Sequence, residues 1–194
     1  MVDRSNGYEG VAAEFLAWRG GPGASRIGAE AVRRWARRLP EGSTVLDLGC
    51  GSGVPITEVL IELGLAVYGV DASPSLVSAF QKRWPHTPIK CEAVEESAFF
   101  GRTFDAVLAW GLMFLLSASD QRKLIGRTSE ALKAGGLLLF TSPAEAVTWN
   151  DVMTGQSSRS LGAPEYRRLI SSSGLAVVDE YDDEGKNHYF EAVK

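Results

Sequence analysis

Short apolar runs alternate with amphipathic segments through the middle of this 194-residue chain. The apolar runs predict β-strands, at 44–48, 65–70, 88–91, 104–110 and 137–141. The amphipathic segments predict helices, at 26–39, 55–63, 73–80 and 120–133. Because the strands are apolar almost throughout, they predict a parallel sheet that helices cover on both faces.

The two ends of the chain depart from this alternation. Aromatic residues over 8–18 have the spacing of one helix face, and the glycines and proline of 20–23 would end that helix. Residues 143–161 predict a loop of a length that often carries function, before a helix at 163–173. Two final strands, 175–181 and 187–193, predict an antiparallel hairpin at the edge of the sheet.

One stretch, Val45 to Pro55, joins the first strand to the first helix of the alternation through three glycines. Gly49, Gly51 and Gly53 allow a sharp turn and a close approach of a ligand to the backbone. The helix that follows would present free N–H groups to the same ligand. The stretch therefore predicts a site for a nucleotide-like molecule at the carboxyl end of the strand.

Two kinds of nucleotide-like ligand fit such a turn: a dinucleotide such as NAD, and a molecule with an ammonium or sulfonium group. The spacing of the glycines decides between them. A dinucleotide site requires Gly-x-Gly-x-x-Gly, but the sixth position is Val54 when counted from Gly49. Asp47 would also repel a pyrophosphate, whereas it would attract an ammonium or sulfonium group. Asp71, at the end of the second strand, can accept both hydroxyls of a ribose in either ligand.

These motifs resemble those of the class I S-adenosylmethionine-dependent methyltransferases. The resemblance covers about residues 40–142, and four segments carry it: 45–53, 67–73, 104–110 and 132–140. It implies an α/β fold, a doubly wound Rossmann-like sheet of seven mostly parallel strands with an antiparallel last strand and helices on both faces. We expect a single domain over 1–194, in which 1–39 form an N-terminal lid and helices and 143–173 form a loop and helix on the substrate side.

The resemblance also implies which residues hold the cofactor, S-adenosylmethionine. The expected cofactor-binding residues are Asp47, Gly49, Cys50, Gly51, Gly53, Asp71, Ala72, Ala93, Val94, Trp110 and Arg26. Asp47 would favour the ammonium group, Asp71 the ribose hydroxyls, and the segment from Glu92 to Val94 the adenine. Glu92, Glu95 and Glu96 remain alternatives for the adenine amino group. Trp110 would lie near the transferred methyl group or serve only as a core aromatic residue.

Composition and charge limit the partners and the cellular location to be expected. The net charge of −4 gives no general electrostatic reason to expect nucleic acid as a partner. No apolar run is long enough for a membrane helix, and the first residues lack the pattern of a signal peptide. Cys50 and Cys91 have neither disulfide nor metal-ligand spacing, so we expect no metal and a cytoplasmic protein.

The methyl acceptor is marked only weakly. An Asn-Pro-Pro-Tyr type of run is missing after the fourth predicted strand, which argues against nucleobase amino groups. A small-molecule acceptor is the preferred hypothesis, with His188 as the candidate general base because it opens the last strand beside the crevice. A non-catalytic protein that binds S-adenosylmethionine or S-adenosylhomocysteine, and an NAD-dependent oxidoreductase, are the alternatives.

Overall fold

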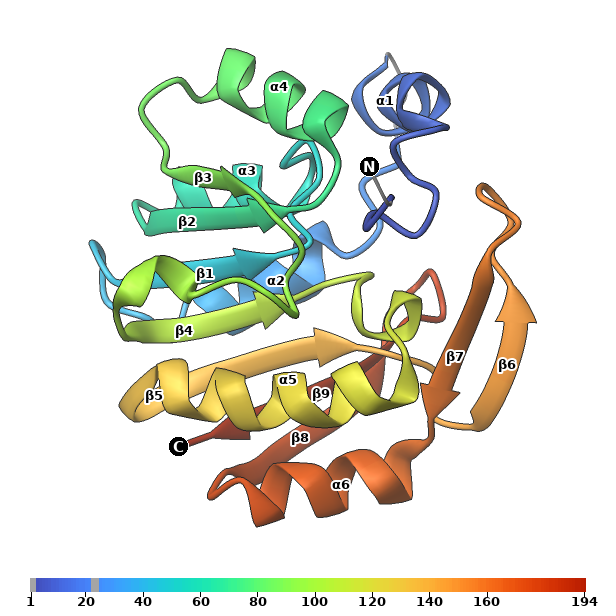
Figure 1. The fold of residues 1–194 in the computed structure, drawn as a ribbon. Helices are drawn as coiled ribbons and strands as arrows, with labels where there is room; N and C mark the ends of the chain where they lie inside the picture. The colour runs from blue at the N-terminus through green and yellow to red at the C-terminus, as the bar shows by residue number, and fades with distance from the viewer. Residues whose placement is uncertain (1–2, 22–24) are drawn as a thin grey trace.

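Seven strands form the central sheet in the order β3-β2-β1-β4-β5-β9-β8 (Figure 1). The computed structural model describes residues 3–21 and 25–194. The strands are β1 (Thr44–Leu48), β2 (Ala66–Asp71), β3 (Ile89–Cys91), β4 (Phe104–Ala109), β5 (Leu132–Thr141), β8 (Ala176–Asp182) and β9 (His188–Val193). The first five are mutually parallel, and β9 lies antiparallel to both of its neighbours. The predicted sheet, with its reversed last strand, is confirmed.

Helices cover both faces of this sheet. They are α1 (Ala12–Gly20), α2 (Ala29–Ala36), α3 (Ile56–Glu62), α4 (Pro74–Arg83), α5 (Ala118–Ala131) and α6 (Ala163–Ser172). Successive side chains of a strand point to opposite faces, so each central strand serves two cores. On β1, Val45 joins the cluster beneath α2 and α3, whereas Leu46 joins the cluster beneath α5 and α6.

The carboxyl ends of β1, β2 and β4 point toward the N-terminal segment and α1 (Figure 1). Glu9 of this segment fixes it to the start of α4. Its carboxylate accepts hydrogen bonds from the Ser73 hydroxyl, at 2.5 Å, and from the Ser75 hydroxyl, at 2.7 Å. The N-terminal segment therefore lies against the edge of the sheet where a doubly wound fold binds its ligand.

The prediction of a loop over 143–161 is wrong, because two strands form a separate antiparallel hairpin there. These strands are β6 (Ala146–Asn150) and β7 (Ser157–Leu161). The buried positions of β7 are Ser158 and Ser160, so the segment lacks the apolar alternation by which a strand is recognised. Ser160 is satisfied in the interior because its hydroxyl donates to the Pro143 carbonyl, at 2.6 Å.

Two boundaries also differ from the prediction. Helix α1 begins only at Ala12, after turns, and Pro22 and Gly23 of its predicted end lie outside the described residues. Helix α5 ends at Ala131, before the expected Gly135–Gly136 stop. That glycine pair lies within β5 because Gly135 donates to the Lys194 carbonyl and Lys194 donates to the Gly136 carbonyl, at 2.9 and 3.0 Å.

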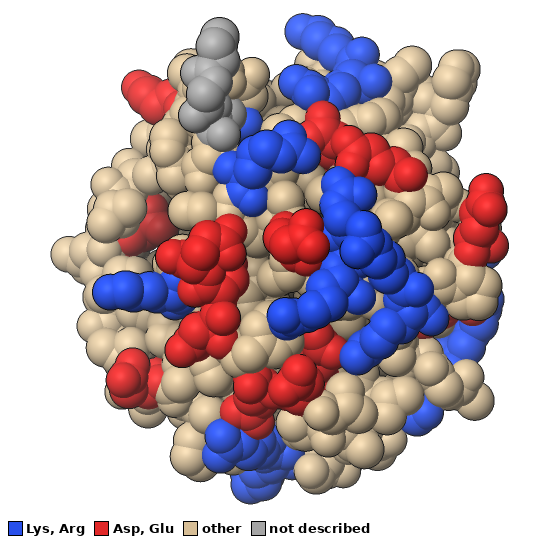
Figure 2. Space-filling view, turned by 180° about the vertical axis from the view of Figure 1, so that it is seen from behind, with Lys and Arg blue, Asp and Glu red and all other residues tan. Residues whose placement is uncertain are grey.

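Charges of both signs are interleaved on the back of the molecule (Figure 2). Two arginines of the α2 region have acidic partners, since Arg33 pairs with Glu62 and Arg38 with Glu191, at 2.5 and 2.7 Å. These arginines therefore form part of a mixed, solvated face rather than a basic patch. Within the described residues, no helix combines the length and the apolar character that a membrane crossing needs.

Candidate functional site

The glycine turn after β1 is held against the end of β2. The amides of Gly49 and Cys50 both donate to the Val70 carbonyl, at 2.8 and 3.2 Å. Gly49 and Gly51 have φ values of 68° and 56°, a left-handed conformation that glycine adopts without strain. Both line the cavity described below, where the predicted ligand would meet their backbone.

Gly53 is needed for close packing of the turn and does not contribute to the cavity. It does not line the cavity, and its φ is 79°. A Cβ at this position would lie 2.2 Å from the Trp84 ring and 3.0 Å from the Phe80 ring. The third glycine of the motif therefore lets the turn pass close to the end of α4.

Asp47 is a buried carboxylate at the end of β1. It lies on the α3 side of the sheet, where the Thr57 hydroxyl donates to its Oδ2 at 2.6 Å. Burial raises the pKa of Asp47 to about 7; the Thr57 hydrogen bond opposes that rise, and the charge of Asp71 adds to it. A carboxyl group in this condition is poised to gain from a cationic ligand.

Asp71, at the end of β2, is the second buried carboxylate. Its Oδ2 accepts from the Gly51 amide and its Oδ1 from the Ser73 amide, both at 2.8 Å. Burial raises the pKa of Asp71, and these two hydrogen bonds oppose the rise. The carboxylate is thus fixed in position, while each oxygen keeps a further lone pair for a ligand hydroxyl.

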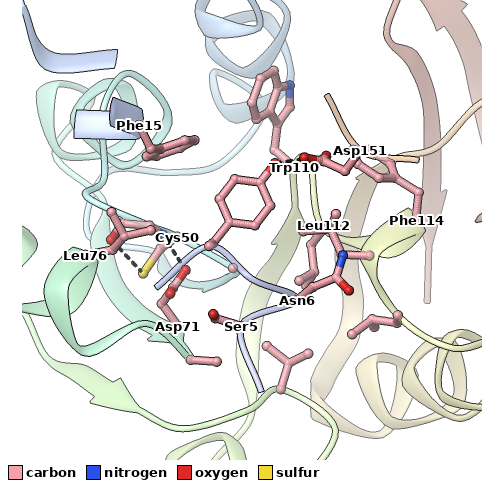
Figure 3. A pocket seen from close by; sticks show the side chains of 18 of the residues that line it. Ser5, Asn6, Phe15, Cys50, Asp71, Leu76, Trp110, Leu112, Phe114 and Asp151 are labelled. Atoms are coloured by element: carbon pink, nitrogen blue, oxygen red, sulfur yellow. Dashed lines mark hydrogen bonds between the residues drawn. The ribbon is translucent and has the colours of Figure 1, made fainter. Parts of the chain in front are cut away.

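A cavity of about 560 Å³ joins these groups. This volume is typical of small-molecule sites. Figure 3 shows Asp71 and Cys50 on one side of it, and Asp151 and Phe114 on the other. Of the predicted cofactor-binding residues, it is lined by Asp47, Gly49, Cys50, Gly51, Asp71, Ala72, Val94 and Trp110. Burial raises the pKa of the Cys50 thiol, so this cysteine stays protonated and unreactive.

The predicted adenine edge is only partly present. Val94 and Glu95 line the cavity, but Ala93 does not. Glu96 forms an ion pair with Arg4, and Glu92 lies 3.8 Å from Lys90. Glu95 is therefore the one of the three alternative glutamates that the cavity includes.

Arg127 of α5 holds this adenine-edge loop, a role the sequence did not indicate. Its Nη1 donates to the carbonyls of Val94 and Glu95, both at 2.9 Å, and its Nη2 donates to the carbonyl of Ser97. The guanidinium also packs on the Phe99 ring, 4.4 Å from the centroid. One side chain thus satisfies three carbonyls that lie far from it in sequence.

Replacing Arg127 with alanine should lower the free energy of unfolding by about 1–3 kcal/mol, since three carbonyls lose a charged donor. The control is Arg122→Ala, on the same helix as Arg127. It removes an exposed ion pair with Glu165 of α6 and should cost less than about 1 kcal/mol. Urea unfolding of both variants measures the difference. Equal losses would show that Arg127 contributes no more than a surface pair.

Arg19 is the functional candidate that sequence reasoning missed. Its side chain lines the cavity and is only 6% exposed. The guanidinium lies between two rings, 4.6 Å from the Trp18 centroid and 4.7 Å from the Trp110 centroid. Its Nη1 is buried and has no hydrogen-bond partner in the described part of the chain. Burial lowers the pKa of Arg19, as expected for a cation that forms no ion pair with the described residues.

Besides Gly53 and Ala93, the predicted residues Arg26 and His188 lie outside the cavity. Arg26 does not line it; its Nη1 pairs with Glu58 at 2.9 Å on the surface. His188 does not line it either, because its ring lies between the carboxylates of Asp182 and Glu180, at 2.7 and 3.6 Å. The start of β9 does reach the cavity, since Asn187 lines it, but the His188 side chain turns toward β8. The general-base role of His188 therefore stays a prediction that this geometry does not favour.

Trp110 lines the cavity as predicted, and its indole is anchored from behind. Its Nε1 donates to the Tyr189 hydroxyl at 2.7 Å. A Cβ at Gly28 would lie 2.5 Å from the same nitrogen, so the backbone before α2 passes close to the ring. The ring therefore has a fixed position that presents it to the cavity and to Arg19.

Comparison with known proteins agrees with this geometry. Residues 45–136 match a family model described as a methyltransferase domain. Over 90 residues the chain is 38% identical to a cypemycin N-terminal methyltransferase of a Streptomyces species. That alignment covers 46% of this chain and 36% of the relative, so the chain spans little more than a third of the length of the curated relative.

Solved structures share the fold over nearly the whole chain. A magnesium protoporphyrin IX methyltransferase of Synechocystis PCC 6803 with bound S-adenosylmethionine superposes with a TM-score of 0.76, at 14% identity, over 100% of this chain and 98% of that one. An amino pentose methyltransferase of Micromonospora echinaspora gives 0.71 at 16% identity, over 94% and 96%. Residues 45–136 thus match a methyltransferase domain, and the whole chain has the fold of the Synechocystis enzyme that binds S-adenosylmethionine.

Proposed function

We propose that this protein transfers the methyl group of S-adenosylmethionine to a small-molecule acceptor. The observation that carries the proposal is one cavity lined by the glycine turn and by two buried carboxylates, Asp47 and Asp71. An anionic pyrophosphate would meet the negative charge of Asp47, whereas a ligand with an ammonium or sulfonium group and a ribose matches both Asp47 and Asp71. The family and the bound ligand of the Synechocystis structure support the same choice.

Different residues of the cavity would contact different parts of the cofactor. Asp47 would attract the ammonium group, with the backbone of Gly49 and Gly51 alongside it. Asp71 would accept the ribose hydroxyls, and Val94 would edge the adenine beside Ala72. Arg19, rather than Arg26, would bind the carboxylate of the methionine part, because its buried Nη1 has no hydrogen-bond partner among the described residues.

Bound S-adenosylmethionine supplies a methyl group on a positively charged sulfur, a good leaving group. The protein has to align the acceptor with that methyl group and exclude water, and alignment alone contributes on the order of 7–11 kcal/mol. Trp110 and the N-terminal segment would provide much of this enclosure. We propose that the part of the N-terminal region before α2 acts as a lid, which Glu9 holds against Ser73 and Ser75. The rest of that region, α2, packs in the core against the sheet.

A small-molecule acceptor fits the remaining part of the cavity. Phe114 and Trp149 meet there with their ring centroids 5.5 Å apart. The mixed charges of the α2 face offer no continuous positive surface for a nucleic acid. The acceptor would therefore enter between the N-terminal segment and the β6–β7 hairpin. Two of the related enzymes named above are methyltransferases of magnesium protoporphyrin IX and of an amino pentose, and the third is named for the N-terminus of cypemycin.

Calorimetry with S-adenosylmethionine, S-adenosylhomocysteine and NADH tests the proposal. We expect both sulfur ligands to bind with one site per chain and NADH to show no heat of binding. A metabolite extract with radiolabelled S-adenosylmethionine then tests for turnover. Binding of NADH alone would contradict the proposal, and cofactor binding without transfer to any acceptor would favour a non-catalytic binding protein.

Replacing Arg19 with glutamine should weaken S-adenosylmethionine binding by about 10- to 100-fold, since one charge-assisted contact to the carboxylate is lost. Arg26→Gln removes an exposed pair and should change the affinity less than about twofold. Decarboxylated S-adenosylmethionine should bind wild type and Arg19→Gln alike. A loss with Arg26→Gln alone would return the role to Arg26.

A further inference from the structure

The side of the cavity opposite Asp71 contains a third buried carboxylate. Asp151 directly follows β6, is 8% exposed and lines the cavity. Figure 3 shows it across the cavity from Asp71, beside Phe114. It therefore lies where the acceptor would meet the proposed methyl donor.

Three donors fix the Asp151 carboxylate. Its Oδ1 accepts from the amides of Met153 and Thr154, both at 2.9 Å. Its Oδ2 accepts from the Tyr8 hydroxyl of the N-terminal segment at 3.2 Å. Burial and the charge of Asp151 both raise the pKa of Tyr8, so this phenol stays protonated and remains a donor. Among the described residues no lysine or arginine forms an ion pair with Asp151.

Aromatic rings surround this carboxylate. Phe114 and Trp149 lie on one side of the cavity, and the Tyr8 and Phe15 rings meet edge to face with centroids 5.5 Å apart. The faces of such rings attract cations, as a carboxylate does. Arg19, the buried cation nearby, is the residue proposed above for the cofactor carboxylate. The acceptor side of the cavity is thus suited to a positively charged or proton-donating group on an apolar body.

The chemistry of the cavity distinguishes amines from hydroxyl acceptors. A hydroxyl group must lose its proton to become a good nucleophile, most often to a histidine or another strong base. The described cavity-lining residues include no histidine and no lysine. An amine that binds to the carboxylate as an ammonium ion first loses one proton to water, and the neutral amine then carries the lone pair that attacks. A carboxylate that orients the amine and relays its protons to water is sufficient for this.

We propose that Asp151, positioned by Tyr8, binds the amino group of an amine acceptor with an apolar or aromatic body, which makes the protein an N-methyltransferase. This inference rests on the proposed function. The amine nitrogen forms the new N–C bond as the C–S bond breaks, and the sulfur keeps that electron pair as a thioether. The proton of the resulting ammonium product passes to Asp151 and then to water.

A matched set of probes tests the inference: phenethylamine, phenethyl alcohol and phenylacetate, which share one ring. Each is titrated into protein saturated with S-adenosylhomocysteine, and each is incubated with S-adenosylmethionine while S-adenosylhomocysteine formation is followed. We expect binding and N-methylation of the amine only. Preference for the alcohol or the carboxylate, or no binding and no methylation of the amine, would overturn the inference.

Asp151→Asn tests the residue itself. The variant keeps Oδ1 for the Met153 and Thr154 amides but loses the charge, so we expect at least tenfold weaker amine binding and a change of less than twofold in S-adenosylmethionine affinity. Tyr8→Phe leaves the hairpin untouched and should weaken amine binding about threefold. Either variant binding the amine as well as wild type would contradict the role assigned to that residue.

Asp120→Asn is the matched control, because it removes a charge of the same sign from the rim of the same cavity. Asp120 lies 3.8 Å from Lys123 and accepts from the Ser117 hydroxyl, so its charge is already partly compensated. An equal loss in this variant would assign the effect to general charge and overturn the specific role of Asp151. Methylation of the alcohol would end the inference and leave the proposed function intact, whereas failure of S-adenosylmethionine to bind would end the proposed function itself.

Discussion

Asp71→Ala is expected to weaken S-adenosylmethionine binding by about 10²–10⁴-fold, the largest loss for any single residue of the cavity. Each ribose hydroxyl that donates to a carboxylate contributes about 1.5–3 kcal/mol, and both hydroxyls lose their acceptor together. Calorimetry measures the change directly. A loss below about tenfold would show that Asp71 does not bind the ribose.

The control for this variant has to separate binding from folding. Asp71 also accepts from the amides of Gly51 and Ser73, so alanine leaves two N–H groups without their partner. Asp71→Asn keeps one carbonyl oxygen and should retain more of the fold while still losing one ribose contact, about 10- to 100-fold in affinity. Thermal unfolding of the ligand-free variants shows how much of each loss reflects the fold.

The middle of the chain could be predicted because its local signals agree with one another. Strands that are apolar on both faces require covering helices, and the glycine turn and Asp71 then lie at the same edge by topology alone. The turn was misread in one respect. Gly53 follows the same motif as Gly49 and Gly51, but what decides its role is the Trp84 ring, which comes from the far end of α4.

The residues that sequence reasoning missed act through contacts between distant segments. Arg19 looks like one more polar residue of a helix until its guanidinium is seen between the Trp18 and Trp110 rings. Arg127 lies on an amphipathic helix, and its three carbonyl partners lie some 30 positions away. Neither contact has a local pattern, because each depends on how the N-terminal segment or α5 packs against the sheet.

The acceptor side was the least predictable part for a related reason. Its hairpin presents serines to the interior, and its key carboxylate, Asp151, lies in what the sequence shows as a polar turn. Tyr8 is one of the aromatic residues of 8–18 with the spacing of one helix face, and Trp149 lies in the segment predicted as a loop. Their meeting with Asp151 and Phe114 required the fold of two segments that are far apart in sequence.

Asp47→Asn should weaken S-adenosylmethionine binding by about 10- to 100-fold and also remove most of its pH dependence. In wild type, burial raises the pKa of Asp47 to about 7, and the cationic ligand favours the ionised carboxylate. Below pH 7 binding must therefore release a proton, so the affinity should rise with pH toward 7 and then level off. Calorimetry in buffers of different ionisation enthalpy counts that proton, and an affinity that does not change between pH 5.5 and 7 would contradict the assignment. Burial raises the pKa of Asp71 too, so Asp71 contributes to the same pH dependence. The pH dependence that remains in Asp47→Asn is the contribution of Asp71.

The same substitution should stabilise the protein without its ligand. The pKa of Asp47 is higher in the folded state than in the unfolded chain, so ionisation opposes folding, and wild-type stability should fall as the pH rises from about 4 to 7. Asparagine can still accept from Thr57 through Oδ1 but carries no charge, so this decline should be smaller in Asp47→Asn.

At pH 8 the ligand-free variant should melt about 4–8 °C above wild type, because a relief of about 2 kcal/mol corresponds to that interval in a chain of this size. Saturating S-adenosylmethionine should largely cancel this difference, since wild type gains about 1.4–2.7 kcal/mol more from binding than a variant with 10- to 100-fold lower affinity. A variant that is both less stable without ligand and weaker in binding would mean that Asp47 supports the fold. A variant that is more stable yet weaker in binding would show that the buried charge is maintained for the ligand at the expense of stability.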